Sequence, residues 1–147
     1  MSTGDSVPQV LQLLAGKCAS PFMLRYLEEL LGTMSLIPDP YYNSDYGYYH
    51  ISEPGGHLGH MLTISHHQSI GIPHVLNIVV YLTPSWSDGD GGALHLFDQN
   101  GQNSIARIPC LFNRAVIFAC NPSAFHGVEP IKENFKLARR SLYFAYY

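Results

Sequence analysis

An arginine and a serine near the end of the chain have the types and the spacing to bind a carboxylate. A strand is predicted over 140–147 from its aromatic and apolar residues. Ser141 lies at its start, and Arg139 directly precedes it. Side chains two residues apart on a strand share a face, so Arg139 and Ser141 face one way and Arg140 the other. A guanidinium fork beside a hydroxyl suits a buried carboxylate. The alternative is that Arg139 and Arg140 form a solvated basic pair.

The eight histidines are the other group that can do chemistry, because imidazole is a common ligand of transition metals. His126 lies in the segment Phe-His-Gly-Val-Glu-Pro, within a strand predicted over 124–129, and His60 lies in a strand predicted over 57–65. His66 and His67 fall where a loop is expected. The further candidates for a metal ligand are His57, His66, His67, His74 and His95.

Helices that must support these residues are predicted in the first third of the chain. Ser6 can cap a first helix that ends at Gly16, and Ser20 can cap a second one with Pro21 at its first position and Gly32 at its end. The second helix is apolar enough to lie against a sheet.

Eight strands are predicted after the helices, and the order of elements favours an α+β fold in which a β-sandwich is backed by helices. No repeat or linker interrupts the sequence, which indicates a single domain over 1–147, helical over 1–40 and β over 41–147. The predicted strands cover 46–51, 57–65, 74–83, 93–97, 105–108, 115–120, 124–129 and 140–147.

Composition limits the classes of partner. With 8 Lys and Arg against 11 Asp and Glu, the 147-residue chain lacks the basic surplus that a nucleic-acid partner requires. No apolar run approaches the roughly 20 residues of a membrane-spanning helix, and residues 1–8 do not resemble a signal peptide. Cys18, Cys110 and Cys120 have no framework spacing, so we expect free buried thiols and a cytoplasmic protein.

Several segments, taken in order, make the chain similar to the prolyl 4-hydroxylase-like branch of the 2-oxoglutarate/Fe(II) oxygenases. The resemblance extends over roughly 41–147 and implies a double-stranded β-helix, also called a jelly-roll or cupin-like fold, with helices packed on one sheet. The segments are Pro54-Gly-Gly-His-Leu-Gly, 76–86, Gly91-Gly-Ala-Leu-His-Leu-Phe-Asp, Phe112-Asn-Arg-Ala-Val-Ile-Phe, Phe125-His-Gly-Val-Glu-Pro and Arg139-Arg-Ser-Leu-Tyr.

The resemblance also implies roles for particular residues. His126 matches the distal histidine that binds Fe(II), and Arg139 with Ser141 matches the pair that receives the distal carboxylate of 2-oxoglutarate. Tyr81 matches a tyrosine that hydrogen-bonds the same carboxylate, and Asn77 lies on its face of the strand. A plain core tyrosine is the alternative for Tyr81.

The sequence departs from the family at the His-x-Asp pair that supplies the other two iron ligands. Counting along the strand places Met61 at the histidine position and Thr63 at the aspartate position, and both are poor ligands for Fe(II). The alternation of side chains along this strand agrees with that count. If the apolar residues form the outer face, under the helices, then Met61 and Thr63 face the interior and His60 points outward. The residues expected outside are Leu58, Leu62 and Ile64.

Three interpretations of this strand remain open. The site can be degenerate and unable to hold iron in the usual way; the strand can be shifted by one residue, so that His60 and His126 bind Fe(II) and one position stays open; or other histidines recruit the metal. The function implied is a hydroxylase-type oxidation of an amino-acid, peptidyl or small-molecule substrate. The alternative is a catalytically altered member of the family: a pseudoenzyme, a binding or accessory protein, or a non-redox enzyme that uses the same cavity. A homodimer is the oligomeric state considered for the binding or accessory protein.

Overall fold

Two short helices open the described part of the chain. The structure, a computed structural model, describes residues 7–33, 35–39, 49–62, 66–67, 69–134 and 136–147. For Leu58 and for residues 60–62 this description covers the backbone and not the side chains. Helix α1 spans Gln9–Cys18 and α2 spans Pro21–Leu31. At 10 and 11 residues, neither of these described helices is long and apolar enough to cross a membrane.

The ends of α2 follow the sequence signals, whereas the end of α1 does not. The Ser20 hydroxyl accepts a hydrogen bond from the Met23 amide at 3.4 Å, and Gly32 takes the left-handed conformation that ends α2. Helix α1 continues through Gly16 to Cys18, two residues beyond the predicted stop. Cys18 is buried against the sheet, and this packing extends the helix past a glycine that only permits a stop. Ser6, the predicted cap, lies outside the described residues.

The eight predicted strands are all present, most of them trimmed at the ends. They are β1 Tyr49–Ser52, β2 Leu58–Leu62, β3 Leu76–Tyr81, β4 Leu94–Phe97, β5 Ser104–Ile108, β6 Ala115–Ala119, β7 Phe125–Val128 and β8 Arg139–Tyr146.

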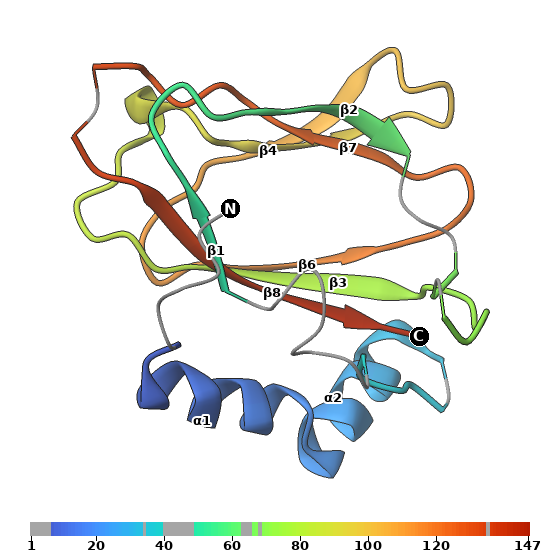
Figure 1. The fold of residues 1–147 in the computed structure, drawn as a ribbon. Helices are drawn as coiled ribbons and strands as arrows, with labels where there is room; N and C mark the ends of the chain where they lie inside the picture. Colours follow the sequence, from blue (N-terminus) through green and yellow to red (C-terminus); the bar gives the residue numbers. More distant parts are fainter. Residues whose placement is uncertain (1–6, 34, 40–48, 63–65, 68, 135) are drawn as a thin grey trace.

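The strands form two antiparallel four-stranded sheets that face each other (Figure 1). One sheet has the order β1-β8-β3-β6 and the other the order β2-β7-β4-β5. Neighbours within each sheet are mostly distant in the sequence, as β3 pairs with both β6 and β8. This arrangement is the jelly-roll, or double-stranded β-helix, and confirms the expected fold class.

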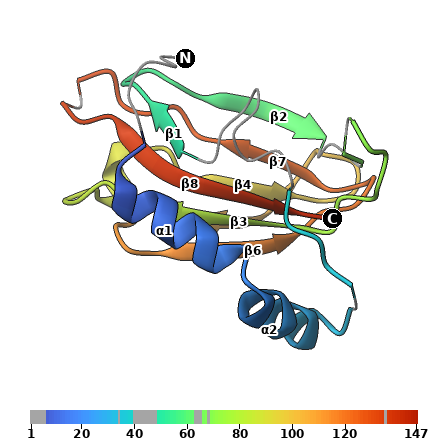
Figure 2. The ribbon, with the colours of Figure 1, turned by 60° about the horizontal axis from the view of Figure 1, so that its bottom comes forward.

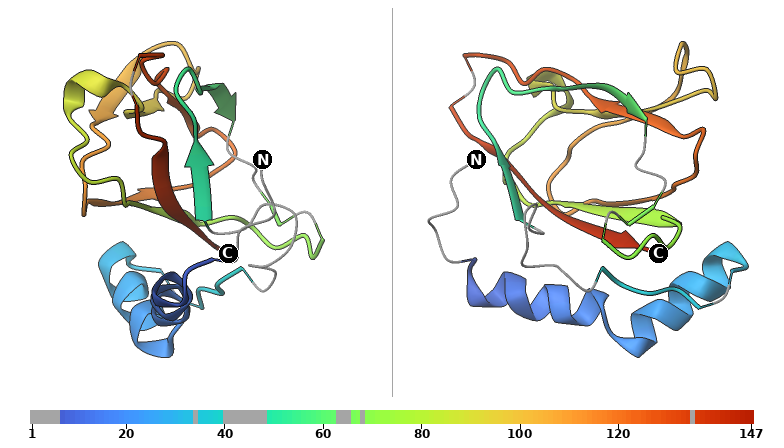
Figure 3. Two further views of the ribbon diagram at one scale, coloured as in Figure 1. Left: turned by 60° about the vertical axis from the view of Figure 1, so that its left-hand side comes forward. Right: turned by 45° about the vertical axis from the view of Figure 1, so that its right-hand side comes forward.

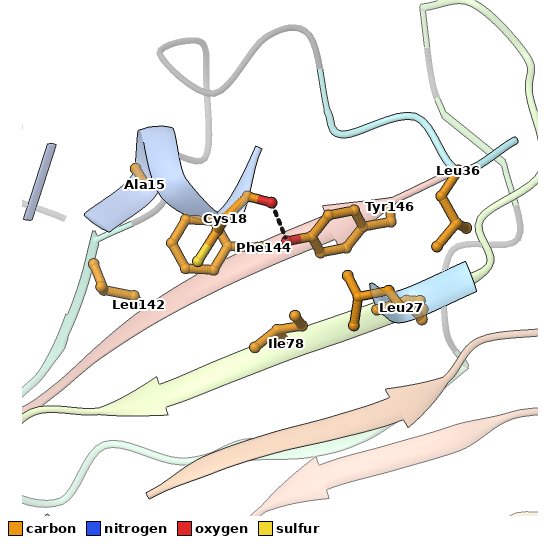
Figure 4. Packing of buried hydrophobic residues seen from close by; sticks show 9 residues of the cluster. Ala15, Cys18, Leu27, Leu36, Ile78, Leu142, Phe144 and Tyr146 are labelled. Atoms are coloured by element: carbon orange, nitrogen blue, oxygen red, sulfur yellow. Dashed lines mark hydrogen bonds between the residues drawn. The ribbon is translucent and has the colours of Figure 1, made fainter. Parts of the chain in front are cut away.

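Both helices pack on the outer face of the first sheet (Figure 2). Side chains at alternate positions of β3 and β8 meet the helices, and the Tyr146 hydroxyl donates a hydrogen bond to the Cys18 carbonyl at 3.0 Å (Figure 4). The buried residues of this layer are Ala15, Cys18, Leu27, Leu36, Leu76, Ile78, Leu142, Phe144 and Tyr146.

Strand β2 belongs to the other sheet, which the helices do not cover (Figure 3). The expectation that the apolar residues of this strand lie under the helices is therefore wrong for Leu58 and Leu62. The apolar sides of the helices pack against β3 and β8 instead. Ile64 itself lies outside the described residues.

The second buried layer fills the space between the sheets. Val79 and Tyr81 of β3 point into it, whereas Leu76 and Ile78 of the same strand point to the helices. The residues buried between the sheets are Val79, Tyr81, Trp86, Leu94, Cys110, Phe118, Cys120 and Ile131. All three cysteines are free and buried, as predicted.

Candidate functional site

The interior faces of β3 and β8 bring four of the predicted binding residues together. Asn77 and Tyr81 stand four residues apart on β3, and Arg139 and Ser141 stand two apart on β8. The antiparallel register pairs Tyr81 with Ser141, so the two strands present these side chains side by side. All four residues are buried, while the adjacent Arg140 is exposed. Arg139 is therefore not part of a solvated pair.

Arg139 is a buried cation that lacks a protein anion. The residue is 7% exposed, and no carboxylate among the described residues forms an ion pair with it. Its guanidinium carbon lies 5.0 Å from the centroid of the Tyr81 ring, and its Nε has no hydrogen-bond partner within the protein. A buried charge without a partner is costly, so the arrangement favours an anionic ligand at this place.

Tyr81 supplies a second unpaired group beside the cation. The side chain is fully buried, and among the described residues no group meets its hydroxyl in good hydrogen-bonding geometry, although the Arg139 side chain lies close to it. Burial raises the pKa of Tyr81, and the nearby Arg139 charge offsets part of that rise. The hydroxyl therefore keeps its proton at neutral pH and can donate it to a ligand.

Three neighbours hold Arg139 in place. A Cβ built on Gly92, which has a φ of +72°, would lie 3.0 Å from Arg139 Cδ and 3.4 Å from Trp86 Cζ2. Trp86 is fixed in turn by a hydrogen bond from its Nε1 to the Gly91 carbonyl at 3.0 Å. The Thr83 hydroxyl accepts from the Arg140 amide at 2.7 Å and donates to the Ala138 carbonyl, which anchors the start of β8.

Asn77 forms the far end of the same face. It is 1% exposed, and its Oδ1 lies 2.8 Å from His74 Nε2. The Nδ2 of Asn77 has no hydrogen-bond partner within the protein. His74 is itself buried and stacks on Tyr147, with ring centroids 4.9 Å apart. His74 therefore holds the amide so that its N–H2 group stays available.

His126 faces the interior from β7, in the opposite sheet. The register pairs it with Leu96 of β4, which packs in the core between the sheets, and its ring centroid lies 5.6 Å from that of Phe118. Burial, reinforced by the charge of His74, lowers the pKa of His126. The imidazole is therefore neutral at neutral pH, as a metal ligand must be.

The register on the other side of His126 bears on the predicted metal site. Strand β2 pairs with β7 so that Met61, and not His60, is the cross-strand partner of His126. Thr63 lies outside the described residues, as do the side chains of His60 and Met61. Within the described ranges, no three His, Cys, Asp or Glu side chains come together as a metal site. The backbone register, which sets Met61 opposite His126, agrees with the sequence count, and methionine is a poor ligand for Fe(II).

The other histidines do not converge on His126 as one cluster. His95 lies on the outer face of its sheet, where its ring nitrogens contact Glu129 Oε1 at 2.7 Å and Ser104 Oγ at 2.8 Å. His67 lies near Asp39 and against Tyr147. His57 and His66 are exposed. His74 is close enough to His126 for its charge to lower the pKa of His126.

His50 and Cys110 are interior residues that the sequence reasoning missed. The register pairs His50 of β1 with Ser141, and its ring stacks on Tyr143 at 5.6 Å with an interplanar angle of 14°. Cys110 is buried beside Tyr81 and Arg139, where burial raises the pKa of its thiol. The alternation of β1 is the signal that could have pointed to His50. Cys110 lies outside the strands and carries no such signal.

A largely apolar hollow of about 440 Å³ opens beside His126. Phe118 and Ile105 form part of its wall, and Asp98, Gln99 and Asn121 contribute polar groups. A hollow of this size that reaches a neutral imidazole can receive part of a second molecule.

Comparisons with known proteins agree with this geometry. A family model described as the 2OG-Fe(II) oxygenase superfamily matches residues 48–147. The chain is similar to a prolyl-4-hydroxylase from Pseudomonas putida, with a TM-score of 0.56 and 18% identity over 86% of this chain and 60% of that one. It is also similar to a prolyl 4-hydroxylase from Phytophthora capsici, with a TM-score of 0.59 and 19% identity over 90% of this chain and 41% of that one.

The chain thus spans less than two thirds of the length of either hydroxylase chain. At these identities the structural likeness concerns the fold alone. A search of curated proteins finds no match.

Proposed function

The chain belongs to the 2OG-Fe(II) oxygenase superfamily, whose members in general use Fe(II) and 2-oxoglutarate, and on that premise we propose that it binds 2-oxoglutarate between its two sheets. In this proposal Arg139 and Ser141 hold the distal carboxylate, Tyr81 donates its hydroxyl proton to the same group, and Asn77 lines the other end.

One observation carries the proposal. Among the described residues, three buried side-chain polar atoms lack a hydrogen-bond partner: Asn77 Nδ2, Tyr81 Oη and Arg139 Nε. All three belong to the face that resembles the co-substrate site. Leaving a buried donor unpaired costs about 1–3 kcal/mol, and more for a charged group. A dicarboxylate with an oxygen at each end satisfies donors of this kind, so these residues fit 2-oxoglutarate.

The roles of the residues follow from their surroundings. Arg139 neutralises the distal carboxylate in a dry space, where a charge-assisted hydrogen bond is stronger than in water. Gly92 leaves the room that the Arg139 side chain occupies, and Tyr81 places its ring under the guanidinium and adds a directed donor. When bound, 2-oxoglutarate would supply two of the four electrons that reduce dioxygen in this superfamily, and the oxidised substrate would supply the other two. The described residues of this chain bind and orient the co-substrate.

The metal is the atypical part of the proposed site. His126 is the imidazole that would hold Fe(II), with His60 as a second ligand if the side chains of β2 are shifted by one residue. Met61 as the backbone partner of His126 does not favour that shift. We therefore propose an oxygenase-like protein of the hydroxylase type and derive no chemical step through the metal.

The substrate of this activity would be an amino-acid, peptidyl or small-molecule group that enters by the hollow beside His126. The names of the two similar hydroxylases support a prolyl or related peptidyl substrate. Free thiols support a cytoplasmic location. A homodimer is supported by the apolar side chains of α2 that remain exposed, Phe22, Tyr26 and Leu30.

A second candidate function follows from Met61. If Met61 and Thr63 occupy the ligand positions, the domain keeps the co-substrate pocket and lacks the iron chemistry. It would then be a catalytically altered member that binds a ligand, or a non-redox enzyme.

Titration calorimetry with 2-oxoglutarate, in the presence of Fe(II) under anaerobic conditions, tests the binding proposal. We expect Arg139→Gln to weaken binding by about 100-fold or more, since charge-assisted hydrogen bonds are lost. The matched control is Arg140→Gln, the adjacent exposed arginine, which should change the affinity by less than about twofold. Equal affinities of the two variants would contradict the proposed pocket.

Iron content and succinate formation separate the two candidate functions. Stoichiometric iron with succinate formed from 2-oxoglutarate favours the oxygenase, and loss of iron in His60→Ala assigns the second ligand. Absence of both signals, together with new iron binding in the double variant Met61→His, Thr63→Asp, favours the altered member.

A further inference from the structure

We propose that this chain binds a five-carbon dicarboxylate at both ends through its own side chains, so that binding needs no metal ion. The inference rests on the proposed function, because it accepts the Arg139 pocket. It goes beyond that function by assigning the second carboxylate of the ligand to the amide of Asn77.

The unpaired donors stand at both ends of one interior face. Arg139 Nε and Tyr81 Oη are at one end, and Asn77 Nδ2 is at the other. Asn77 and Tyr81 are four residues apart on β3, a rise of about 13 Å along the strand. An extended five-carbon diacid with a hydrogen bond of about 2.8 Å at each end has a comparable length. The length of one such ligand therefore matches the distance along β3 between the positions of Asn77 and Tyr81.

The orientation of Asn77 is set for donation. Its carbonyl oxygen is occupied by His74 Nε2 at 2.8 Å, and His74 is clamped by its stacking on Tyr147. Asn77 is 1% exposed, and its amide nitrogen has no partner in hydrogen-bonding geometry among the described residues, although the Tyr143 hydroxyl lies near this side chain. An Asn amide held by its oxygen in this way presents two N–H groups to an incoming carboxylate. His74 is a positioning residue for this contact.

Strand β2, where the family places two metal ligands, has an atypical residue beside His126. Met61 is the register partner of His126, and the described residues form no three-ligand cluster. Among the described residues, the group offered to the oxo-acid end of the ligand is therefore the Asn77 amide. With this donor, the 2-oxo group of the ligand is dispensable for binding.

Calorimetry on the whole chain in EDTA tests this inference, with 2-oxoglutarate, glutarate and pentanoate as ligands. We expect 2-oxoglutarate and glutarate to bind with affinities within about threefold of each other, and Mn²⁺ added in place of EDTA to change neither by more than that. Pentanoate, which has one carboxylate, should bind at least about tenfold more weakly, because one set of charge-assisted hydrogen bonds is missing.

Variants at the second anchor complete the test. Asn77→Leu should weaken glutarate binding at least about tenfold and leave the weak pentanoate binding unchanged. Asn100→Leu, at an exposed asparagine, is the control and should change neither affinity. His74→Gln, which can still donate to Oδ1, should retain most of the glutarate affinity that His74→Ala loses.

The outcomes separate the inference from the proposed function. If 2-oxoglutarate binds only with added metal and glutarate does not bind, the inference is overturned and the proposed function stands. If neither diacid binds with or without metal, both are overturned. Equal binding of glutarate by the wild-type chain and Asn77→Leu would also overturn the assignment of Asn77.

Discussion

The guanidinium of Arg139 lies over the ring of Tyr81, 5.0 Å from its centroid, and both residues are buried between the sheets. The ring face attracts the cation but does not neutralise it, so the pair still calls for an anion. The Tyr81 hydroxyl approaches Arg139 closely enough for the charge to lower its pKa, yet it lacks a hydrogen-bond partner within the protein. In the proposed function, the carboxylate of 2-oxoglutarate would supply the partner that this pair lacks.

Tyr81→Phe separates stability from binding. Removing an unpaired buried hydroxyl should leave the ligand-free protein as stable as the wild type, or more stable by up to about 1 kcal/mol. The same change should weaken 2-oxoglutarate binding about tenfold. Urea denaturation and calorimetry measure the two effects. Tyr146→Phe is the matched control: its hydroxyl donates to Cys18, so its loss should destabilise the protein by about 1 kcal/mol. Destabilisation by Tyr81→Phe would contradict the account of an unpaired hydroxyl.

Gly92→Ala should displace Arg139. The new Cβ would stand 3.0 Å from Arg139 Cδ, and the φ of +72° adds about 1–2 kcal/mol of backbone strain. We expect at least a tenfold loss of 2-oxoglutarate affinity by calorimetry. Gly71→Ala has a similar φ of +69° and no atom within 4 Å of the new Cβ, so it tests the strain alone. If both variants bind equally well, Gly92 does not hold the arginine.

Leu27→Ala should destabilise the helical layer. Leu27 of α2 is fully buried against the sheet, and truncation of such a leucine costs about 2–5 kcal/mol. Leu30 of the same helix is 56% exposed, and Leu30→Ala should cost less than about 0.5 kcal/mol. Urea midpoints of the two variants give the comparison. A similar shift in both would mean that α2 does not pack as described.

Glu129 should make stability depend on acid pH. Two hydrogen bonds from Arg107, at 2.6 and 3.0 Å, and one contact with His95 lower the pKa of Glu129 from 4.5 to about 2. A carboxyl with a lowered pKa stabilises the fold above its unfolded-state pKa. The stability is lost as the pH falls from about 4.5 to about 2. Because the pair is partly exposed, we expect a loss of no more than about 1 kcal/mol.

Denaturation by urea across this pH range measures the effect. Glu129→Gln should remove this part of the pH dependence, and Glu133→Gln, at an exposed glutamate, should keep it. Parallel curves for the wild type and Glu129→Gln would show that the ion pair contributes nothing.

Local signals predicted much of the fold. Ser20 and Gly32 marked the ends of α2, since capping depends on neighbouring residues only. Residue types and turn signals identified the strands, and the period of two placed Arg139 and Ser141 on one face, which the structure buries. Gly16 was misleading, because packing of Cys18 against the sheet decided where α1 ends.

The rest of the site depends on which strands become neighbours. The pairing of Met61 with His126 and the closeness of Cys110 to Arg139 arise from strand order, which a single sequence does not reveal. The choice of sheet under the helices is of the same kind, and it made the expectation for Leu58 and Leu62 wrong. The Asn77–His74 contact was missed because a strand over 74–83 would place these two side chains, three positions apart, on opposite faces, whereas β3 begins only at Leu76.

The two faces of β8 serve different neighbours, with Arg139 and Ser141 toward the space between the sheets and Leu142 and Phe144 toward the helices. Deleting one residue from this strand would exchange the two sets, turning apolar groups toward the interior between the sheets and the arginine toward the helices. The length of β8 is therefore under as much constraint as its composition. Homologous chains should accept substitutions here far more readily than insertions or deletions.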